Sequence, residues 1–282
     1  MTLHDAWGTP VTVDKAPEAI VSLTLATDEI LVELVDPKRL AAIDSFSADP
    51  GISNISAFAQ TFPNKISGER ETILALRPDL VLVADWKERD FIQTLRDAGL
   101  RVFVVKAPET FAQLRQAVTA LAVLVGEPGR GKDLLDKIDR RLAAIDAKVE
   151  SIEPTQRLTV LAYSFSGTTL GRGTSFDALV SRAGLINAAG RAGIVGWPSI
   201  SKEQILQLDP DIIALPSWSY DGKNDANEYR DRFLKDPVFS SLKAVKSKRV
   251  VVFSDRHMDS NSQYMVDGVE DLAGTAWPQL FR

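Results

Sequence analysis

The chain has 282 residues, of which 45% are hydrophobic and 25% are charged. This is the composition of an ordinary globular protein long enough for about two domains. Its 33 basic and 38 acidic residues give a net charge of −5, and the absence of a long basic run argues against nucleic acid as a partner. The sequence holds no cysteine, which excludes disulfides and thiolate metal ligands. Because no stretch reaches the roughly 18 apolar residues that span a bilayer, we expect a soluble chain.

Strands and helices alternate along the first half of the chain. The apolar run Ala19–Leu23 predicts a buried parallel strand. Thr27 is the predicted N-cap of the helix that follows, with Asp28 and Glu29 in its first turn. Further strands are predicted at 39–44, 79–84 and 101–105, and helices at 71–76 and 89–99. This alternation is typical of βαβ units around a parallel sheet.

A long helix is predicted between the two halves. Leu134, Ile138, Leu142, Ile145 and Val149 recur at spacings of three and four, which places them on one helical face. About 22 helical residues would extend roughly 33 Å, enough for a stiff connection between two domains.

The stretch GEPGRGKD, residues 126–133, nearly matches a phosphate-binding loop. Asp133 occupies the place of the Ser or Thr that holds magnesium, and the apolar segment before the loop has helical length. The sequence therefore favours a helix–turn–helix junction over a nucleotide site.

The second half repeats the pattern of the first. Strands are predicted at 157–163, 211–215 and 249–253, and helices at 174–184, 201–208 and 265–276. Residues 67–86 and 199–218 align without a gap. Their identical pairs are Ser67/Ser199, Glu71/Glu203, Ile73/Ile205, Leu74/Leu206, Leu76/Leu208, Pro78/Pro210, Asp79/Asp211 and Trp86/Trp218. Each half is thus predicted to be a small doubly wound α/β lobe.

Four stretches carry a resemblance to a known family. AIVSLTLATDEIL, ETILALRPDLVLV, GWPSISKEQILQLDPDIIAL and DPVFSSLKAVKSKRVVVF occur in this order. Together they resemble the periplasmic-binding-protein class that captures cobalamin, ferric siderophores or haem for ABC importers. The resemblance implies two doubly wound α/β lobes, 1–126 and 153–282, joined by one long helix within 127–152, with a ligand cleft between the lobes.

Aromatic and basic residues are predicted to gather where strands end. Ligands of open α/β sheets bind outside the carboxyl ends of the strands, and flat aromatic rings there suit a large chelate. Lys87 and the arginines would supply donors to an anionic chelate. The candidate ligand-binding residues are Phe46, Trp86, Tyr163, Phe165, Arg172, Trp197, Trp218, Tyr220, Arg256, His257 and Tyr264.

Direct metal ligation is left open at this stage. His4 and His257 are the two histidines of the chain, which argues against a site for a free transition-metal ion. His257, Tyr163, Tyr220 and Tyr264 are possible ligands of a chelated metal, although a lone loop histidine is more often a surface residue. No intrinsic cofactor is expected.

Glu71 and Glu203 occupy the same position in the two copies of the repeat. A glutamate at a helix N-terminus favours the helix dipole, which explains either one alone. The resemblance implies that they dock onto arginines of the two permease subunits.

The resulting function hypothesis is a non-enzymatic, monomeric, extracytoplasmic binding protein, free or lipid-anchored, that delivers an iron(III)-siderophore-type chelate to an ABC importer. Cobalamin is the alternative, because Trp86, Phe165 and Gly196–Pro198 lie near positions where cobalamin-binding members of the class place aromatics. Haem is the third candidate. An enzyme or chelatase on a related fold is the competing class, although YSFSGTT lacks the glycine of a nucleophile elbow before Ser166.

Overall fold

The computed structural model describes residues 2–220 and 222–281 of the chain. These residues form two compact units. The first extends to Ile138 and includes Asn261–Gln263, and the second comprises Asp139–Ser260 and the chain from Tyr264 onward. Both units are α/β with parallel sheets, as the sequence predicts. The lobe boundaries at 126 and 153 stay predictions, since the two units divide inside the long helix.

The first unit is built on a five-stranded parallel sheet in the order β5-β4-β3-β6-β7. A short antiparallel pair precedes it. The strands are β1 Thr2–His4, β2 Pro10–Thr12, β3 Ile20–Ser22, β4 Leu40–Asp44, β5 Lys65–Ile66, β6 Leu80–Ala84 and β7 Val102–Val105. β3 and β6 are entirely buried, as expected for strands covered on both faces.

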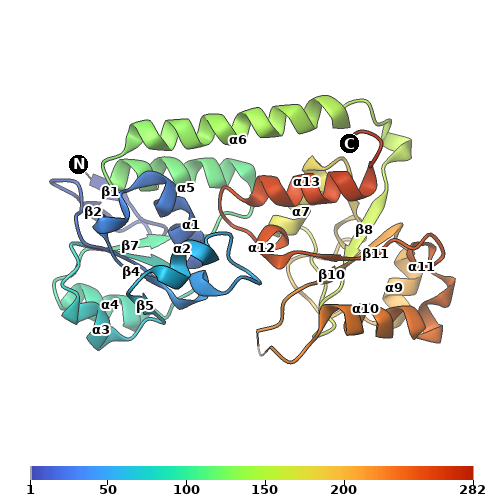
Figure 1. Ribbon diagram of the computed structural model, residues 1–282, viewed down its shortest axis with the longest axis horizontal. Helices are drawn as coiled ribbons and strands as arrows, with labels where there is room; N and C mark the ends of the chain where they lie inside the picture. Colours follow the sequence, from blue (N-terminus) through green and yellow to red (C-terminus); the bar gives the residue numbers. More distant parts are fainter. Residues whose placement is uncertain (1, 221, 282) are drawn as a thin grey trace. The chain divides into compact units, whose positions relative to one another are not determined.

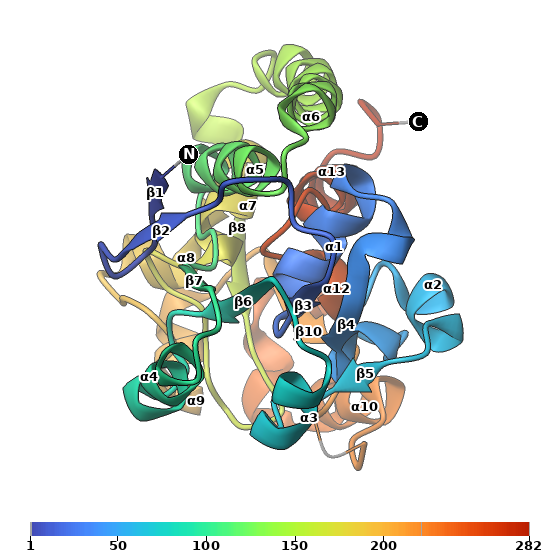
Figure 2. The same ribbon diagram turned by 90° about the vertical axis from the view of Figure 1, so that its left-hand side faces the viewer.

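Helices cover both faces of this sheet. On one face, Ile73 of α3 and Ile92 of α4 pack with Val81 and Val104 in a buried cluster. Figures 1 and 2 show α1 and α5 on the opposite side of the strands. The helical segments are α1 Leu25–Leu34, η1 Pro37–Arg39, η2 Ser45–Ala48, α2 Ser56–Thr61, α3 Arg70–Ala75, α4 Arg89–Asp97 and α5 Phe111–Leu124.

The predicted N-cap of α1 is wrong by three residues. Thr24 is the cap, and its side chain accepts a hydrogen bond from the backbone N–H of Thr27. The helix starts earlier because Thr24, two residues past the end of β3, already has the extended conformation of an N-cap. Asp28 still lies in the first turn of the helix, and the side chains of Asp28 and Glu29 are both buried.

The second unit has a four-stranded parallel sheet in the order β11-β10-β8-β9. Ile205 of α9 and Phe233 of α10 pack against Leu161 and Ile213 on one face, and α7 and α13 lie on the other (Figure 1). Its strands are β8 Thr159–Ala162, β9 Ile186–Asn187, β10 Ile212–Pro216 and β11 Val250–Phe253. Its helical segments are η3 Pro154–Gln156, α7 Ser175–Arg182, α8 Ala188–Arg191, α9 Lys202–Leu208, α10 Ala226–Lys235, η4 Pro237–Ser241, α11 Lys243–Lys246, α12 Asp255–Met258 and α13 Met265–Ala276.

The predicted long helix is α6, Pro128–Val149. All five residues of its predicted apolar face, from Leu134 to Val149, are buried. α5 ends at Leu124, so the near phosphate-loop sequence forms a helix–turn–helix junction, as predicted. A side chain at Gly131 would clash with the β-carbon of Ala122, which explains the glycine at this close approach.

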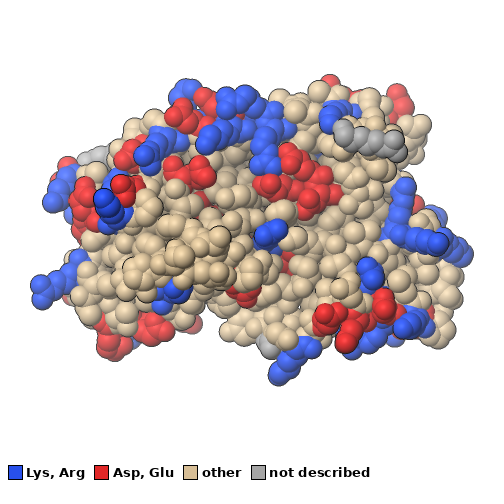
Figure 3. Space-filling view, viewed as in Figure 1, with Lys and Arg blue, Asp and Glu red and all other residues tan. Residues whose placement is uncertain are grey.

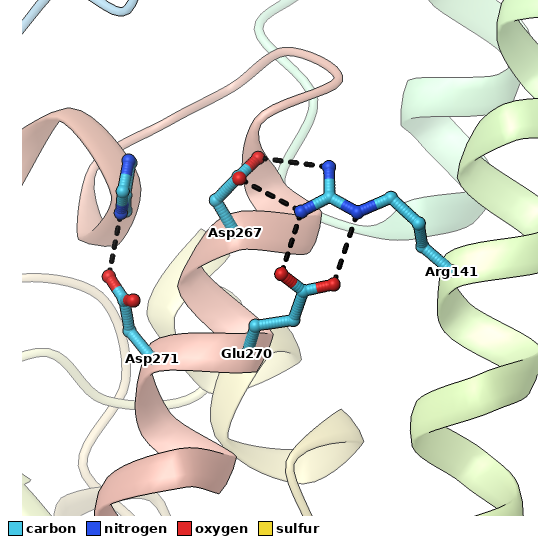
Figure 4. A network of polar contacts seen from close by, with 5 residues as sticks. Arg141, Asp267, Glu270 and Asp271 are labelled. Carbon is cyan, nitrogen blue, oxygen red and sulfur yellow. Dashed lines mark hydrogen bonds and ion pairs between the residues drawn. The ribbon is translucent and has the colours of Figure 1, made fainter. Parts of the chain in front are cut away.

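The solvent side of α6 carries charges of both signs, which Figure 3 shows side by side along the helix. In the second unit, Arg141 of α6 donates to both carboxylates of Asp267 and Glu270 on α13 (Figure 4). These hydrogen bonds raise the pKa of Arg141. Within the described residues, no helix is both long enough and apolar enough to cross a membrane.

The repeated stretch forms the same turn in each unit. α3 and α9 are followed by Arg77 and Asp209, which have φ angles of 47° and 39° in the left-handed region. Each is followed by proline, which cannot continue a helix. Two non-glycine residues in this sparsely populated conformation show that the turn is imposed by its surroundings.

The repeated aspartate is what holds the turn in place. Asp79 accepts hydrogen bonds from the backbone N–H groups of Glu18 and Ala19, at 2.8 and 3.0 Å, just before β3. Asp211 accepts from the backbone N–H and the hydroxyl of Thr159 at the start of β8, both at 2.8 Å. In each unit this carboxylate joins the amino ends of two neighbouring strands, β6 to β3 and β10 to β8.

We predict that Asp79→Ala and Asp211→Ala each lower the free energy of unfolding by about 1–3 kcal/mol, because backbone donors at the sheet edge lose their acceptor. Urea denaturation of the single variants measures this loss. The exposed Asp14 is the matched control, and Asp14→Ala is expected to change stability by less than about 0.5 kcal/mol. Equal effects for all three variants would refute the structural role of the repeat.

Candidate functional site

Each sheet has one position where the strand order reverses. In the first unit the chain proceeds from β3 to β4 and β5 on one side and then to β6 and β7 on the other. In the second unit the reversal lies between β8 and β10. Ligands of such sheets bind at this position, outside the carboxyl ends of the strands. The loops after β3, β6, β8 and β10 are therefore the first places to look for a site.

Trp86 lies at the reversal point of the first unit, two residues past the end of β6, as predicted. Its side chain is 69% exposed. The Nζ atom of Lys87 lies 5.3 Å from the ring centroid of Trp86 and 5.9 Å from that of Phe91. An exposed indole with a cation beside it can contact a ligand that is both apolar and anionic.

Phe46 follows β4 in the turn η2 and is 39% exposed. The turn is fixed by buried Asp28, whose Oδ2 accepts from the backbone N–H of Asp44 at 2.8 Å and from the hydroxyl of Ser47 at 2.6 Å. Asp44 in turn accepts from the backbone N–H of Phe46. The direction of Phe46 therefore depends on the buried carboxyl group of Asp28, whose burial the sequence did not reveal.

Burial raises the pKa of Asp28 well above its usual value, against the hydrogen bonds from Ser22 and Ser47 that lower it. The folded chain thus holds this proton more tightly than the unfolded chain. Stability from this group is full below the unfolded pKa of about 3.9 and is lost as the pH rises toward the raised pKa.

We predict that Asp28→Asn, which cannot ionise, becomes more stable relative to the natural protein as the pH rises through this window, by up to about 1.4 kcal/mol per pH unit. Free energies of unfolding at pH 4.5 and pH 7.5 give the difference. A constant difference for Asp28→Asn would mean that the carboxyl group ionises as freely as in the unfolded chain.

In the second unit, the loop after β8 carries Tyr163 and Phe165. Tyr163 is half-buried and packs against the core cluster, with its ring 6.2 Å from that of Tyr229. Phe165 lies 4.7 Å from the same Tyr229 ring. The Tyr229 hydroxyl donates to the carbonyl of Ser164 at 2.6 Å, and burial raises its pKa. Tyr229, which the sequence analysis missed, therefore fixes the loop as a protonated donor.

Trp197 lies in a loop that is tied to the loop after β8. The backbone N–H of Gly171 donates to the carbonyl of Gly196, and that of Thr169 donates to the carbonyl of Pro198. A side chain at Gly171 would clash with the backbone carbonyl of Ile194, so only glycine permits this approach. Trp197, 60% exposed, is thereby held near the reversal point although it follows a different strand.

The loop after β10 carries Trp218 and Tyr220. Their rings make an edge-to-face contact with centroids 6.2 Å apart. Trp218 is half-buried, whereas Tyr220 is 80% exposed. This loop is therefore a second aromatic surface at the carboxyl edge of the sheet.

Arg256 and His257 lie in α12, directly after β11. Arg256 is exposed, as is Arg172 in the loop after β8. His257 Nδ1 lies 2.6 Å from Oδ2 of Asp271 on α13, the helix seen in Figure 4. When Nδ1–H is donated to this carboxylate, Nε2 carries the free lone pair that a metal chelate needs. Tyr264 stands at the N-cap position of α13.

A site for a bare metal ion is a separate question. Across residues 2–220 and 222–281, no three His, Asp or Glu side chains come together in a way that would hold such an ion. His257 and the tyrosines stay candidates for single ligands of a chelated metal.

Glu71 and Glu203 are the second residues of α3 and α9, and both are exposed. The residue before each is basic and lies over a phenyl ring, with Arg70 5.5 Å from the Phe91 centroid. Lys202 lies 5.7 Å from the Phe239 centroid. A hydrogen bond from its own backbone N–H lowers the pKa of Glu203, so this carboxylate is charged at neutral pH. Each unit thus exposes one glutamate at the second position of a helix, directly after a basic residue that lies over a phenyl ring.

The profile of the family described as periplasmic binding protein matches residues 20–256. The chain belongs to the periplasmic binding protein family. The uncharacterized ABC transporter substrate-binding lipoprotein YvrC of Bacillus subtilis is 25% identical over 289 residues, which cover 100% of this chain and 87% of that protein. This periplasmic binding protein is thus related to substrate-binding components of ABC transporters.

Two further proteins that are similar to this chain are named after different ligands. A cobalamin-binding protein of Halobacterium salinarum is 26% identical over 215 residues, 76% of this chain and 58% of that protein. The molybdate-binding protein MolA of Haemophilus influenzae superposes with a TM-score of 0.81 at 19% identity, covering 100% of this chain and 92% of that one. At this identity the similarity shows the fold.

Proposed function

We propose that this periplasmic binding protein captures a metal chelate outside the cytoplasm and delivers it to an ABC importer, without catalysing a reaction. The observation that carries the proposal is the set of large aromatic side chains at the carboxyl edges of both sheets. A monomeric protein rarely exposes several such rings unless they contact a ligand or partner. The members of the set with the greatest exposure are Trp86, Trp197 and Tyr220.

An anionic ferric siderophore is the first candidate ligand. Lys87 and Arg172 lie in the loops that follow β6 and β8, and Arg256 lies in the short helix α12 after β11. Guanidinium and ammonium groups at these places supply donors to carboxylate or catecholate oxygens of such a chelate. Cobalamin is the second candidate, because the aromatic surface suits a corrin ring and a relative bears the name cobalamin-binding protein.

A binding screen separates these ligands. Ferric enterobactin, ferrichrome, cyanocobalamin, haemin and molybdate would be titrated against the protein, with tryptophan fluorescence as the readout. Ferric enterobactin is expected to bind, and its affinity to fall as salt rises, because exposed charges are screened. Salt-independent binding of cyanocobalamin alone would select the second candidate. Binding of molybdate alone would refute the hypothesis that the ligand is a metal chelate.

We predict that Trp86→Ala and Trp197→Ala each weaken binding of the chelate by about 1–3 kcal/mol through lost contact area, with little change in melting temperature because both rings are exposed. Melting temperature and dissociation constant are measured for the same variants. The contrasting variant is Trp277→Ala, because Trp277 is buried and its indole N–H donates to the carbonyl of Ala183. It should lower the melting temperature and leave affinity nearly unchanged.

We predict that replacing Glu71 and Glu203 together by Ala leaves chelate affinity within about twofold and abolishes the ligand-dependent stimulation of ATP hydrolysis by the importer, since charge complementarity fixes the docked orientation. The control replaces Glu18 and Glu150, one exposed glutamate from each unit outside the repeat. Stimulation that survives the first double variant, or disappears in the control, would exclude these glutamates as the docking residues.

A further inference from the structure

Asp255 joins two neighbouring strand ends in the second unit. β10 and β11 are paired as far as Pro216 and Phe253. Beyond that point, Oδ2 of Asp255 accepts hydrogen bonds from the backbone N–H groups of Ser217 and Trp218, both at 2.6 Å. It also accepts from the Ser217 hydroxyl at 3.0 Å, and this hydroxyl accepts from the Asp255 backbone N–H at 3.0 Å. The side chain thus continues the pairing of the two strands past the end of the sheet.

The surroundings of Asp255 make this contact specific. The residue is 7% exposed, and a buried carboxylate is tolerated when donors surround it. Two successive backbone N–H groups that donate to one oxygen restrict the backbone conformation at Ser217 and Trp218. The loop that starts there leads to α10, which begins at Ala226.

The contact between the rings of Trp218 and Tyr220 extends this backbone restriction to Tyr220, the exposed residue of the loop. Trp218 contacts Tyr220 edge to face, so a rotation of the backbone at Trp218 would also displace Tyr220. We propose that Asp255 is a positioning residue that sets the direction in which Trp218 and Tyr220 leave the sheet. Its effect on ligand affinity rests on the proposed function, whereas its effect on the two rings does not.

Asp211 supplies a matched comparison within the same unit. It makes the same kind of contact at the amino ends of the strands. There, one carboxylate oxygen accepts hydrogen bonds from a backbone N–H and from a hydroxyl. A purely structural contribution of Asp255 would therefore resemble that of Asp211. A positioning role would in addition change the environment of Trp218.

The first experiment follows Trp218 directly. The protein has five tryptophans, and labelling with 5-fluorotryptophan gives each a ¹⁹F resonance, with that of Trp218 assigned by Trp218→Phe. Asp255→Ala should shift or broaden the Trp218 resonance, and Asp255→Asn should restore it, because an amide oxygen can replace Oδ2. Asp211→Ala should lower stability without moving this resonance.

Asp255→Glu is the second variant, in case Asp255→Ala does not fold. Its longer side chain keeps the carboxylate but displaces the oxygen, so the Trp218 resonance should still shift. An unchanged Trp218 resonance in the folded Asp255 variants, or an equal change in Asp211→Ala, would overturn the positioning role.

The second experiment measures ligand affinity with ferric enterobactin and cyanocobalamin. Asp255→Ala should raise the dissociation constant of the bound probe at least about tenfold, and Asp255→Asn less than about threefold. In the Asp255→Ala background, Trp218→Ala should add little, because a misdirected ring no longer contributes. Additive effects would overturn the link to ligand binding. If neither probe binds the natural protein, ferric enterobactin and cyanocobalamin are excluded as its ligands, while the ¹⁹F result still decides the role of Asp255.

Discussion

The hydrogen bond from a backbone N–H to an aspartate carboxyl group at a strand end is the interaction on which both units depend. Parallel strands of two to five residues leave peptide groups unpaired wherever the ladder stops. Asp79 and Asp211 take up these donors where the strands begin, and Asp28 and Asp255 take them up where the strands end. The first pair fixes how strands enter the sheet, and the second pair fixes how loops leave it.

This division explains why the sequence repeats a stretch that spans one helix and one strand. The left-handed residue, the proline and the aspartate are required by the turn into β6 and β10, so stability alone accounts for them. Stability does not account for Glu71 and Glu203, which are exposed and contribute at most a solvent-screened helix-dipole effect. Under the proposed function, the identity at these two positions reflects an importer that contacts the same local surface on each unit.

Regular periodicity made most of the fold predictable, and contacts between distant segments made part of the site unpredictable. The apolar spacing in α6 and the bounds of α13 follow from local sequence, and strand ends located Trp86 and Trp218. Asp255 bonds to Ser217 across 38 residues, and Tyr229 bonds to Ser164 across 65. No spacing rule connects such pairs. The wrong N-cap at Thr27 has a similar origin, because the strand before the helix decided where the helix begins.

Under the proposed function, the exposed rings contact the ligand and buried groups hold those rings in place. The fold is shared with a molybdate-binding protein at 19% identity, so the sheets do not specify the ligand. Exposed rings such as Trp197 and Tyr220 supply contact area to almost any apolar surface, and their orientation decides which shape they fit. That orientation is set by buried groups, the carboxyl group of Asp255 for one loop and the glycine at 171 for another. Substitutions at the anchors of the loops can therefore alter the shape of this surface without changing the rings themselves.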